Sequence, residues 1–148
     1  MTCLRSVKLF GAPLLLDTNI CIYIAQRKPP EVLARFESLA EGEVAMSRIT
    51  FGELRYGANR SANAIKALET IEQLATTIPV VTPDLVVATH YGDIRARLTA
   101  AGTPIGSNYL WIAAHARSAD LILVTNNVVK FRRVPGLRTE NWVGGGRA

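Results

Sequence analysis

Four short, mainly apolar runs without polar alternation constrain the fold of this chain more than any other feature. They are Pro13–Leu16, Glu43–Met46, Ile78–Val81 and Leu121–Val124. A strand that is buried on one face alternates apolar and polar residues, whereas a strand of a parallel sheet covered by helices on both faces is apolar throughout. The four runs therefore predict buried strands of a mostly parallel sheet.

The segments between these runs have the period of amphipathic helices. We expect helices over Ile20–Gln26, Glu31–Glu41, Thr50–Ala58, Ala62–Ala75, Pro83–Ala101 and Asn108–Ala119, the last with Ser107 as its N-cap. Phe131–Trp142 is interpreted as turns and one short strand. Alternating strands and helices predict one α/β domain with a central, mostly parallel β-sheet flanked by α-helices.

Composition excludes several classes of protein. A chain of 148 residues with 49% hydrophobic and 20% charged residues suits one globular domain, and no apolar run reaches the length of a membrane span. The two cysteines form no CxxC pair, and no glycine-rich phosphate-binding motif is present. The net charge of +5 makes an anionic partner plausible. We expect a cytoplasmic protein without a secretory signal.

Polar residues follow two of the predicted strands, where an α/β sheet places its functional crevice. Asp17 comes directly after Leu14–Leu16, and Thr125 and Asn126 follow Leu121–Val124. Asp17 can cap the next helix or take part in catalysis, and its position alone leaves both open. Glu53 lies in Thr50-x-x-Glu53, a pattern that favours a capping box at a helix start.

The other acids and the histidines have ordinary structural explanations. Asp93 stands four residues before Arg97, which is the spacing of a surface ion pair on a helix. Asp84 is expected in the first turn of a helix and Asp120 in the loop before a strand. His90 and His115 fall on predicted helices without a nucleophile and acid to complete a triad.

Several stretches in a fixed order resemble the PIN-domain ribonucleases, and among them the VapC-type toxins of bacterial toxin–antitoxin pairs. The similar stretches are Leu14-Leu15-Leu16-Asp17-Thr18-Asn19, Ser47-x-x-Thr50-x-x-Glu53-Leu54-Arg55-Tyr56-Gly57-Ala58, Gly102-Thr103-Pro104-Ile105-Gly106, Ile112-Ala113-Ala114-His115-Ala116 and Leu123-Val124-Thr125-Asn126-Asn127. The resemblance implies a PIN domain over residues 14–143, preceded by an N-terminal extension over 1–13 and followed by a flexible tail over 144–148.

The resemblance also implies an acidic pocket that holds Mg²⁺ or Mn²⁺ and hydrolyses RNA, with tRNA a common target among the toxins. Residues that match family site positions are the catalytic acids Asp17, Glu53 and Asp93, with Asp17 also a metal ligand, and the neighbouring polar residues Thr18, Asn19, Thr125 and Asn126. Hard divalent cations prefer such oxygen ligands. The implied partners are a VapB-type antitoxin, RNA and a second copy of the chain in a homodimer within the toxin–antitoxin complex.

One position departs from the family pattern. The family carries Gly-x-x-Asp before Ile-Ala-Ala, and the Asp is a principal metal ligand, but here Tyr109 takes its place. A phenol is neutral at pH 7 and supplies no charge for a cation. The sequence therefore predicts a VapC-type endoribonuclease whose activity is attenuated or lost. The alternative is a catalytically silent PIN protein that binds antitoxin or RNA without cleavage.

Two geometric expectations follow. Asp17, Glu53, Asp93 and Tyr109 should meet in one pocket at the carboxyl end of the sheet. The apolar residues of segment 20–24 are too crowded for all to be buried by so short a helix. With Leu54 and Tyr56 they should form an open groove for an antitoxin segment.

Overall fold

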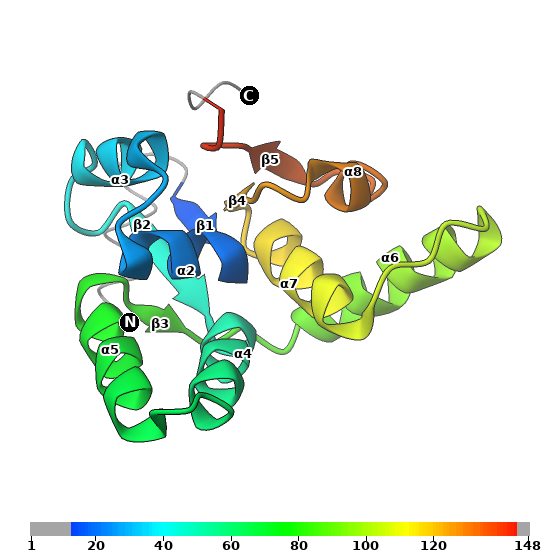
Figure 1. Cartoon of the computed structure of the whole chain (residues 1–148). Helices are drawn as coiled ribbons and strands as arrows, with labels where there is room; N and C mark the ends of the chain where they lie inside the picture. The colour runs from blue at the N-terminus through cyan, green and yellow to red at the C-terminus, as the bar shows by residue number, and fades with distance from the viewer. Residues whose placement is uncertain (1–12, 145–148) are drawn as a thin grey trace.

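The fold is built on a five-stranded parallel sheet, seen in a computed structural model that describes residues 13–144 (Figure 1). The strands are β1 (Leu14–Leu16), β2 (Val44–Ser47), β3 (Val80–Val81), β4 (Ile122–Val124) and β5 (Arg138–Glu140). Their order across the sheet is β3-β2-β1-β4-β5, and every neighbouring pair is parallel. The predicted fold class is confirmed. Most of the predicted N-terminal extension and tail lies outside the described residues.

The three inner strands, β2, β1 and β4, are largely buried on both faces, as their mainly apolar composition predicts. Leu14 and Leu16 point into one hydrophobic cluster together with residues of the helices that follow β1 and β2. Leu15, between them, points into a second cluster on the other face of the sheet, with Leu123 of β4. Successive side chains of a strand face opposite sides, so two cores form around one sheet.

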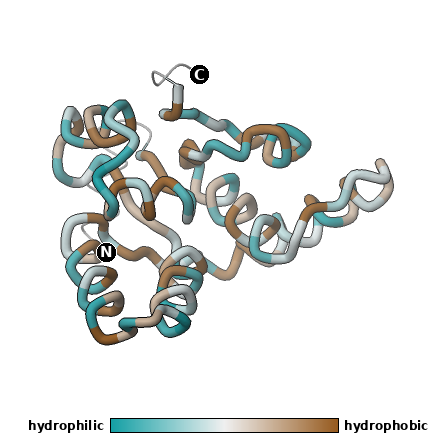
Figure 2. Tube along the Cα trace, in the orientation of Figure 1, coloured by the Kyte–Doolittle hydropathy of each residue, from teal (hydrophilic) through white to brown (hydrophobic). Residues whose placement is uncertain are grey.

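Seven helices surround the sheet within residues 13–144. They are α2 (Thr18–Gln26), α3 (Pro30–Glu37), α4 (Arg48–Asn59), α5 (Ala64–Thr77), α6 (Val87–Ala100), α7 (Ser107–Ser118) and the short α8 (Val128–Phe131). Figure 2 shows hydrophilic and hydrophobic residues alternating along α4 and α5, as expected of helices with one face on the core. No helix in the described part of the chain is long and apolar enough to cross a membrane.

Some predicted boundaries need correction. The helix expected from Pro83 begins only at Val87, because residues before it form turns in which Val87 N–H donates to Asp84 C=O and Ala88 N–H to Leu85 C=O. Asp84 therefore precedes the helix rather than lying in its first turn. Ser107 is the first residue of α7, and Gly106 takes the N-cap position expected for Ser107. Asp120 lies between α7 and β4, as expected.

Candidate active site

Asp17 lies at the centre of the sheet, directly after β1, and is also the N-cap of α2. Its Oδ1 accepts a hydrogen bond from Thr18 N–H at 2.7 Å, and its Oδ2 accepts one from the Thr125 hydroxyl at 2.8 Å. Thr125 follows β4, the parallel neighbour of β1, so the same edge of the sheet supplies both groups. Of the two roles that the sequence leaves open for Asp17, capping of α2 is confirmed. The same residue also lies at the carboxyl end of the sheet, so catalysis stays a prediction.

Burial sets the charge properties of Asp17. Only 3% of the residue is exposed, and this loss of water raises the pKa of its carboxyl group above the usual value. The hydrogen bonds from Thr125 and Thr18 oppose that shift because they stabilise the carboxylate. Asp17 is thus a buried acid held by two uncharged donors, and the described residues include no cation paired with it.

Glu53 comes from the middle of α4, and the capping-box interpretation of its pattern is wrong. The N-cap of α4 is Ser47, whose hydroxyl oxygen accepts a hydrogen bond from Ile49 N–H at 3.2 Å. Thr50 and Glu53 consequently lie inside the helix. The Glu53 carboxylate accepts a hydrogen bond from the side-chain amide of Asn108, at the start of α7.

Asp17, Glu53 and Tyr109 line one cavity of about 300 Å³. Its lining residues are Asp17, Thr18, Asn19, Glu53, Gly106, Asn108, Tyr109 and Ile112. These lining residues come from the start of α2, from the middle of α4, and from the start and middle of α7. The structure therefore brings together three of the four residues expected to meet, across separations of 36 and 56 positions in the sequence.

Tyr109 fills its corner of this cavity with an aromatic ring. The ring packs edge-on against Phe131 of α8, with 5.6 Å between centroids. The Lys130 ammonium lies 4.3 Å from the centroid of the Tyr109 ring, in a cation–π contact. Gly106 also lies against the ring, since a Cβ built there would come within 3.3 Å of Tyr109 Cδ2. The Tyr109 ring is thus held in place by contacts with Phe131, Lys130 and Gly106.

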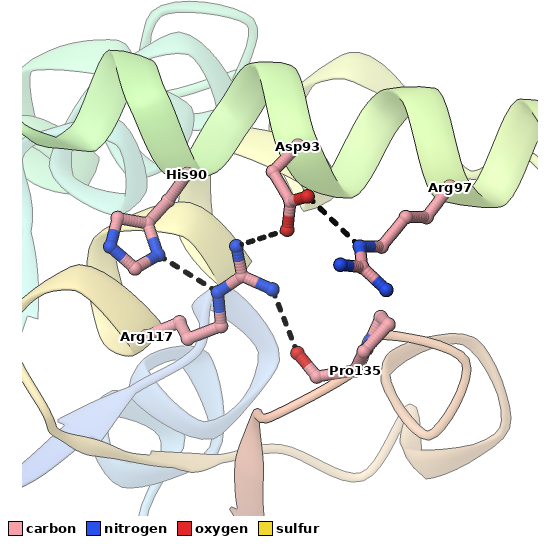
Figure 3. Close-up of polar contacts among 5 residues, drawn as sticks. All are labelled: His90, Asp93, Arg97, Arg117 and Pro135. Atoms are coloured by element: carbon pink, nitrogen blue, oxygen red, sulfur yellow. Dashed lines mark hydrogen bonds and ion pairs between the residues drawn. The ribbon is translucent and has the colours of Figure 1, made fainter.

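Asp93 does not line this cavity. It accepts hydrogen bonds from Arg97 Nε at 2.9 Å and from an Arg117 guanidinium nitrogen at 2.7 Å (Figure 3). Arg117 also donates to His90 Nδ1 and to the Pro135 carbonyl, both at 2.8 Å. The hydrogen bonds from Arg97 and then Arg117 lower the pKa of Asp93. The ion pair with Arg97 is as expected, but the expectation that Asp93 would share the cavity is wrong.

The cavity offers fewer acids for a divalent cation than the family pattern implies. Within residues 13–144 no group of three His, Cys, Asp or Glu side chains is placed to hold a metal ion. The cavity offers two carboxylates, from Asp17 and Glu53, and an aromatic ring with a lysine behind it instead of a third acid. Mg²⁺ takes six oxygen ligands in octahedral geometry and is usually held by one or two carboxylates together with waters. Asp17 and Glu53 are the carboxylates that this cavity offers for that purpose.

Comparison with known proteins decides the family. The sequence pattern of the PIN domain matches residues 14–137. The chain belongs to the PIN-domain family. Among its PIN-domain relatives, Ribonuclease VapC2 of Haemophilus influenzae is 46% identical over 129 residues, which cover 87% of this chain and 97% of the relative. The tRNA(fMet)-specific endonuclease VapC of Shigella flexneri is 47% identical, with coverage of 86% and 96%. This chain is a VapC-type PIN protein.

Solved PIN-domain structures agree with the fold. DNA-bound VapBC from Salmonella typhimurium superposes with a TM-score of 0.83 at 39% identity, over 89% of this chain and 99% of that one. VapBC-1 from nontypeable Haemophilus influenzae gives a TM-score of 0.80 at 38% identity, over 87% and 97%. The expected PIN domain is thus found in both sequence and structure.

The apolar residues of α2 form less of a groove on this PIN domain than the sequence suggests. Ile20, Ile24 and Leu54 are buried in the core, and only part of Tyr23 is covered. Tyr56, by contrast, is 60% exposed. The groove expected along segment 20–24 is therefore largely filled by the protein's own core.

Three features of the PIN-domain site were not predicted. Asn108 donates a hydrogen bond to Glu53, and Lys130 contacts the ring of Tyr109. The hydroxyl of Ser47, the N-cap of α4, lies 2.8 Å from Nδ1 of buried His115 in α7. Each joins side chains from different elements. Only the polar residue Asn108, beside the departure at Tyr109, gave a local hint.

Proposed function

We propose that this chain is the toxin of a VapC–VapB-type toxin–antitoxin pair, an endoribonuclease whose RNA cleavage is attenuated by Tyr109. The observation that carries the proposal is the cavity at the carboxyl end of the sheet, where Asp17 and Glu53 are both lining residues but Tyr109 stands in place of a third acid. Relatives named as ribonucleases and as a tRNA-specific endonuclease support RNA as the substrate class.

The residues have separate roles in this proposal. Asp17 and Glu53 are the catalytic acids, Thr125 holds the Asp17 carboxylate, and Asn108 holds Glu53. Thr18 and Asn19 line the cavity beside Asp17. Asp93 has no part in it, since two arginines already satisfy its charge.

Mg²⁺ or Mn²⁺ is the proposed cofactor by family, and this cavity is proposed to hold it weakly. When bound, a divalent cation supplies charge stabilisation at a scissile phosphate and activates water. Two carboxylates, from Asp17 and Glu53, line the cavity, one fewer than the family pattern supplies. Weak binding of the cation is the proposed cause of the attenuation.

The proposed partners are a VapB-type antitoxin and RNA, with tRNA as the favoured target, in the cytoplasm. Solved relatives named VapBC support the antitoxin. The net charge of +5 supports an anionic substrate. A homodimer within the toxin–antitoxin complex is proposed by family, and light scattering of the co-expressed complex tests it.

The Tyr109→Asp variant tests the function. Purified chains are incubated with tRNA in Mn²⁺, and cleavage is followed on gels. We expect barely detectable cleavage by the chain as it stands and at least about tenfold faster cleavage by Tyr109→Asp, because even indirect loss of metal ligation costs about 10–100-fold. Tyr56→Asp, at an exposed tyrosine outside the cavity, is the matched control and should change nothing. Equal rates for the chain as it stands and Tyr109→Asp would contradict the proposal.

Binding without cleavage is the second candidate function, and the Tyr109–Lys130 contact favours it. A silent PIN protein would still form a complex with its antitoxin or RNA. If Tyr109→Asp restores Mn²⁺ binding but no RNA is cut, the silent binding protein is the better description.

A further inference from the structure

Lys130 does not line the cavity, but from the short helix α8 it contacts the ring of Tyr109, which does. Three residues separate helix α8 from β4, and the backbone of α8 is fixed by hydrogen bonds from Phe131 N–H to Asn127 C=O and from Arg132 N–H to Val128 C=O. Phe131 is buried and anchors the helix in the core. The backbone of the neighbouring Lys130 is therefore fixed, and its side chain reaches the ring of Tyr109.

Two consecutive residues of α8 contact the same ring. Phe131 packs edge-on against Tyr109, and the Lys130 ammonium lies 4.3 Å from the ring centroid. A cation over an aromatic face is attracted by the negative charge of that face. Tyr109 consequently has two effects. It stands where the family carries a carboxylate, and its ring also binds the positive charge of Lys130.

We infer that Lys130 is a second determinant of metal exclusion in this cavity, acting with Tyr109. This inference rests on the proposed function only in taking the Asp17–Glu53 cavity as the site of chemistry. The lysine charge repels a divalent cation from a cavity that already has only two carboxylates. Replacing Tyr109 by Asp removes the ring but leaves the ammonium, which then pairs with the new carboxylate and competes with the metal for it.

Manganese binding by four forms of the full chain tests this inference. They are the chain as it stands, Lys130→Ala, Tyr109→Asp and the double variant, each titrated with Mn²⁺ by calorimetry without RNA. The double variant should bind Mn²⁺ at least about tenfold more tightly than Tyr109→Asp, and Lys130→Ala alone should bind weakly, because it still lacks the third carboxylate.

Two controls separate charge from shape. Lys130→Arg combined with Tyr109→Asp keeps the positive charge and should bind no better than Tyr109→Asp alone. Lys66→Ala in the Tyr109→Asp background removes an exposed lysine of α5 and should leave the affinity within about twofold. A gain with Lys130→Arg equal to that with Lys130→Ala would overturn the role of charge.

The outcomes distinguish this inference from the proposed function. If Tyr109→Asp binds Mn²⁺ as tightly as the double variant, Lys130 has no such role, while the function stands. If the double variant binds Mn²⁺ tightly but cuts no RNA, the role of Lys130 stands and the proposed nuclease function fails. If neither variant binds Mn²⁺, both are wrong.

Discussion

Asp17 and Asp93 are two acids of one domain with opposite surroundings. Asp17 is buried, and its oxygens accept hydrogen bonds from a backbone N–H and a threonine hydroxyl. Asp93 is half-buried and accepts hydrogen bonds from two arginines. Burial raises the pKa of the first carboxyl group, whereas the arginine contacts lower that of the second.

The difference teaches what an acid must keep in order to do chemistry. A carboxylate already paired with two guanidinium groups has little electrostatic attraction left for a cation. A buried carboxylate held only by uncharged donors is not neutralised by a paired cation, and its surroundings strengthen its attraction for one that enters. The surroundings of a carboxylate, rather than its presence in a sequence, decide between the two roles.

The largest expected effect comes from exchanging each acid for its amide in the Tyr109→Asp background. Asp17→Asn should reduce Mn²⁺ affinity and RNA cleavage by at least about 100-fold, because a cavity carboxylate is lost while asparagine can still cap α2. Asp93→Asn should leave both within about twofold. Calorimetry and tRNA cleavage measure the pair. A comparable loss with Asp93→Asn would return Asp93 to the site.

The pH dependence of the free energy of unfolding compares two buried titratable groups, His115 and Asp17. Burial lowers the pKa of His115 to about 4, against 6.5 when exposed. Between these values the unfolded chain binds a proton that the folded protein does not, so the free energy of unfolding falls as the pH drops from 6.5 towards 4. The slope is at most about 1.4 kcal/mol per pH unit.

Asp17 acts in the opposite direction, because its raised pKa makes the folded protein bind a proton before the unfolded chain does. The His115→Gln variant isolates the histidine contribution. Urea unfolding at pH 7, 6 and 5 should show a shallower loss of stability in this variant. Identical slopes would mean that His115 does not titrate as its burial requires.

Two buried threonines provide a matched pair for the hydrogen bond to Asp17. Thr125 and Thr50 are both fully buried, but the Thr50 hydroxyl has no hydrogen-bond partner among the described residues. Thr125→Val should lower the free energy of unfolding by about 1–3 kcal/mol, since it leaves a buried carboxylate short of a donor and Asn127 N–H without its acceptor. Thr50→Val, of the same shape, should cost nothing or stabilise. Equal costs in urea titrations would contradict this account.

The smallest expected effect is at the exposed end of the Asp93 cluster. Arg97→Ala removes a partner whose side chain is 62% exposed, and should change the free energy of unfolding by no more than about 0.5 kcal/mol. Arg117→Ala removes a side chain only 15% exposed with three partners, and should cost more. Thermal unfolding of both variants ranks them. A reversed order would show that the cluster is not organised around Arg117.

Sequence reasoning succeeded where local pattern determines structure. Leu14–Leu16 is an apolar run that can only be buried on both faces, so its place in the sheet, and that of Asp17 after it, followed directly. Tyr109 was likewise found at the cavity because it replaces one residue of an ordered motif.

The sequence did not predict the structure correctly where two neighbouring residues compete for one N-cap position, or where side chains far apart in the sequence meet. Ser47 and Thr50 are both good N-cap residues three positions apart, and only the point where β2 ends selects Ser47. Asp93 lies on the long predicted helix, yet nothing local indicates Arg117 of the next helix as its partner. The same holds for Asn108 with Glu53 and Lys130 with Tyr109, which no spacing in the sequence encodes.

The edges of the sheet have a consequence for handling this chain. The outer strands β3 and β5 are only two and three residues long, and Arg138 and Glu140 of β5 carry charges. A short, charged edge leaves few backbone groups for another molecule to extend by strand pairing. Molecules produced in excess should therefore stay dispersed instead of joining edge to edge into fibrils, even though the inner strands are mainly apolar.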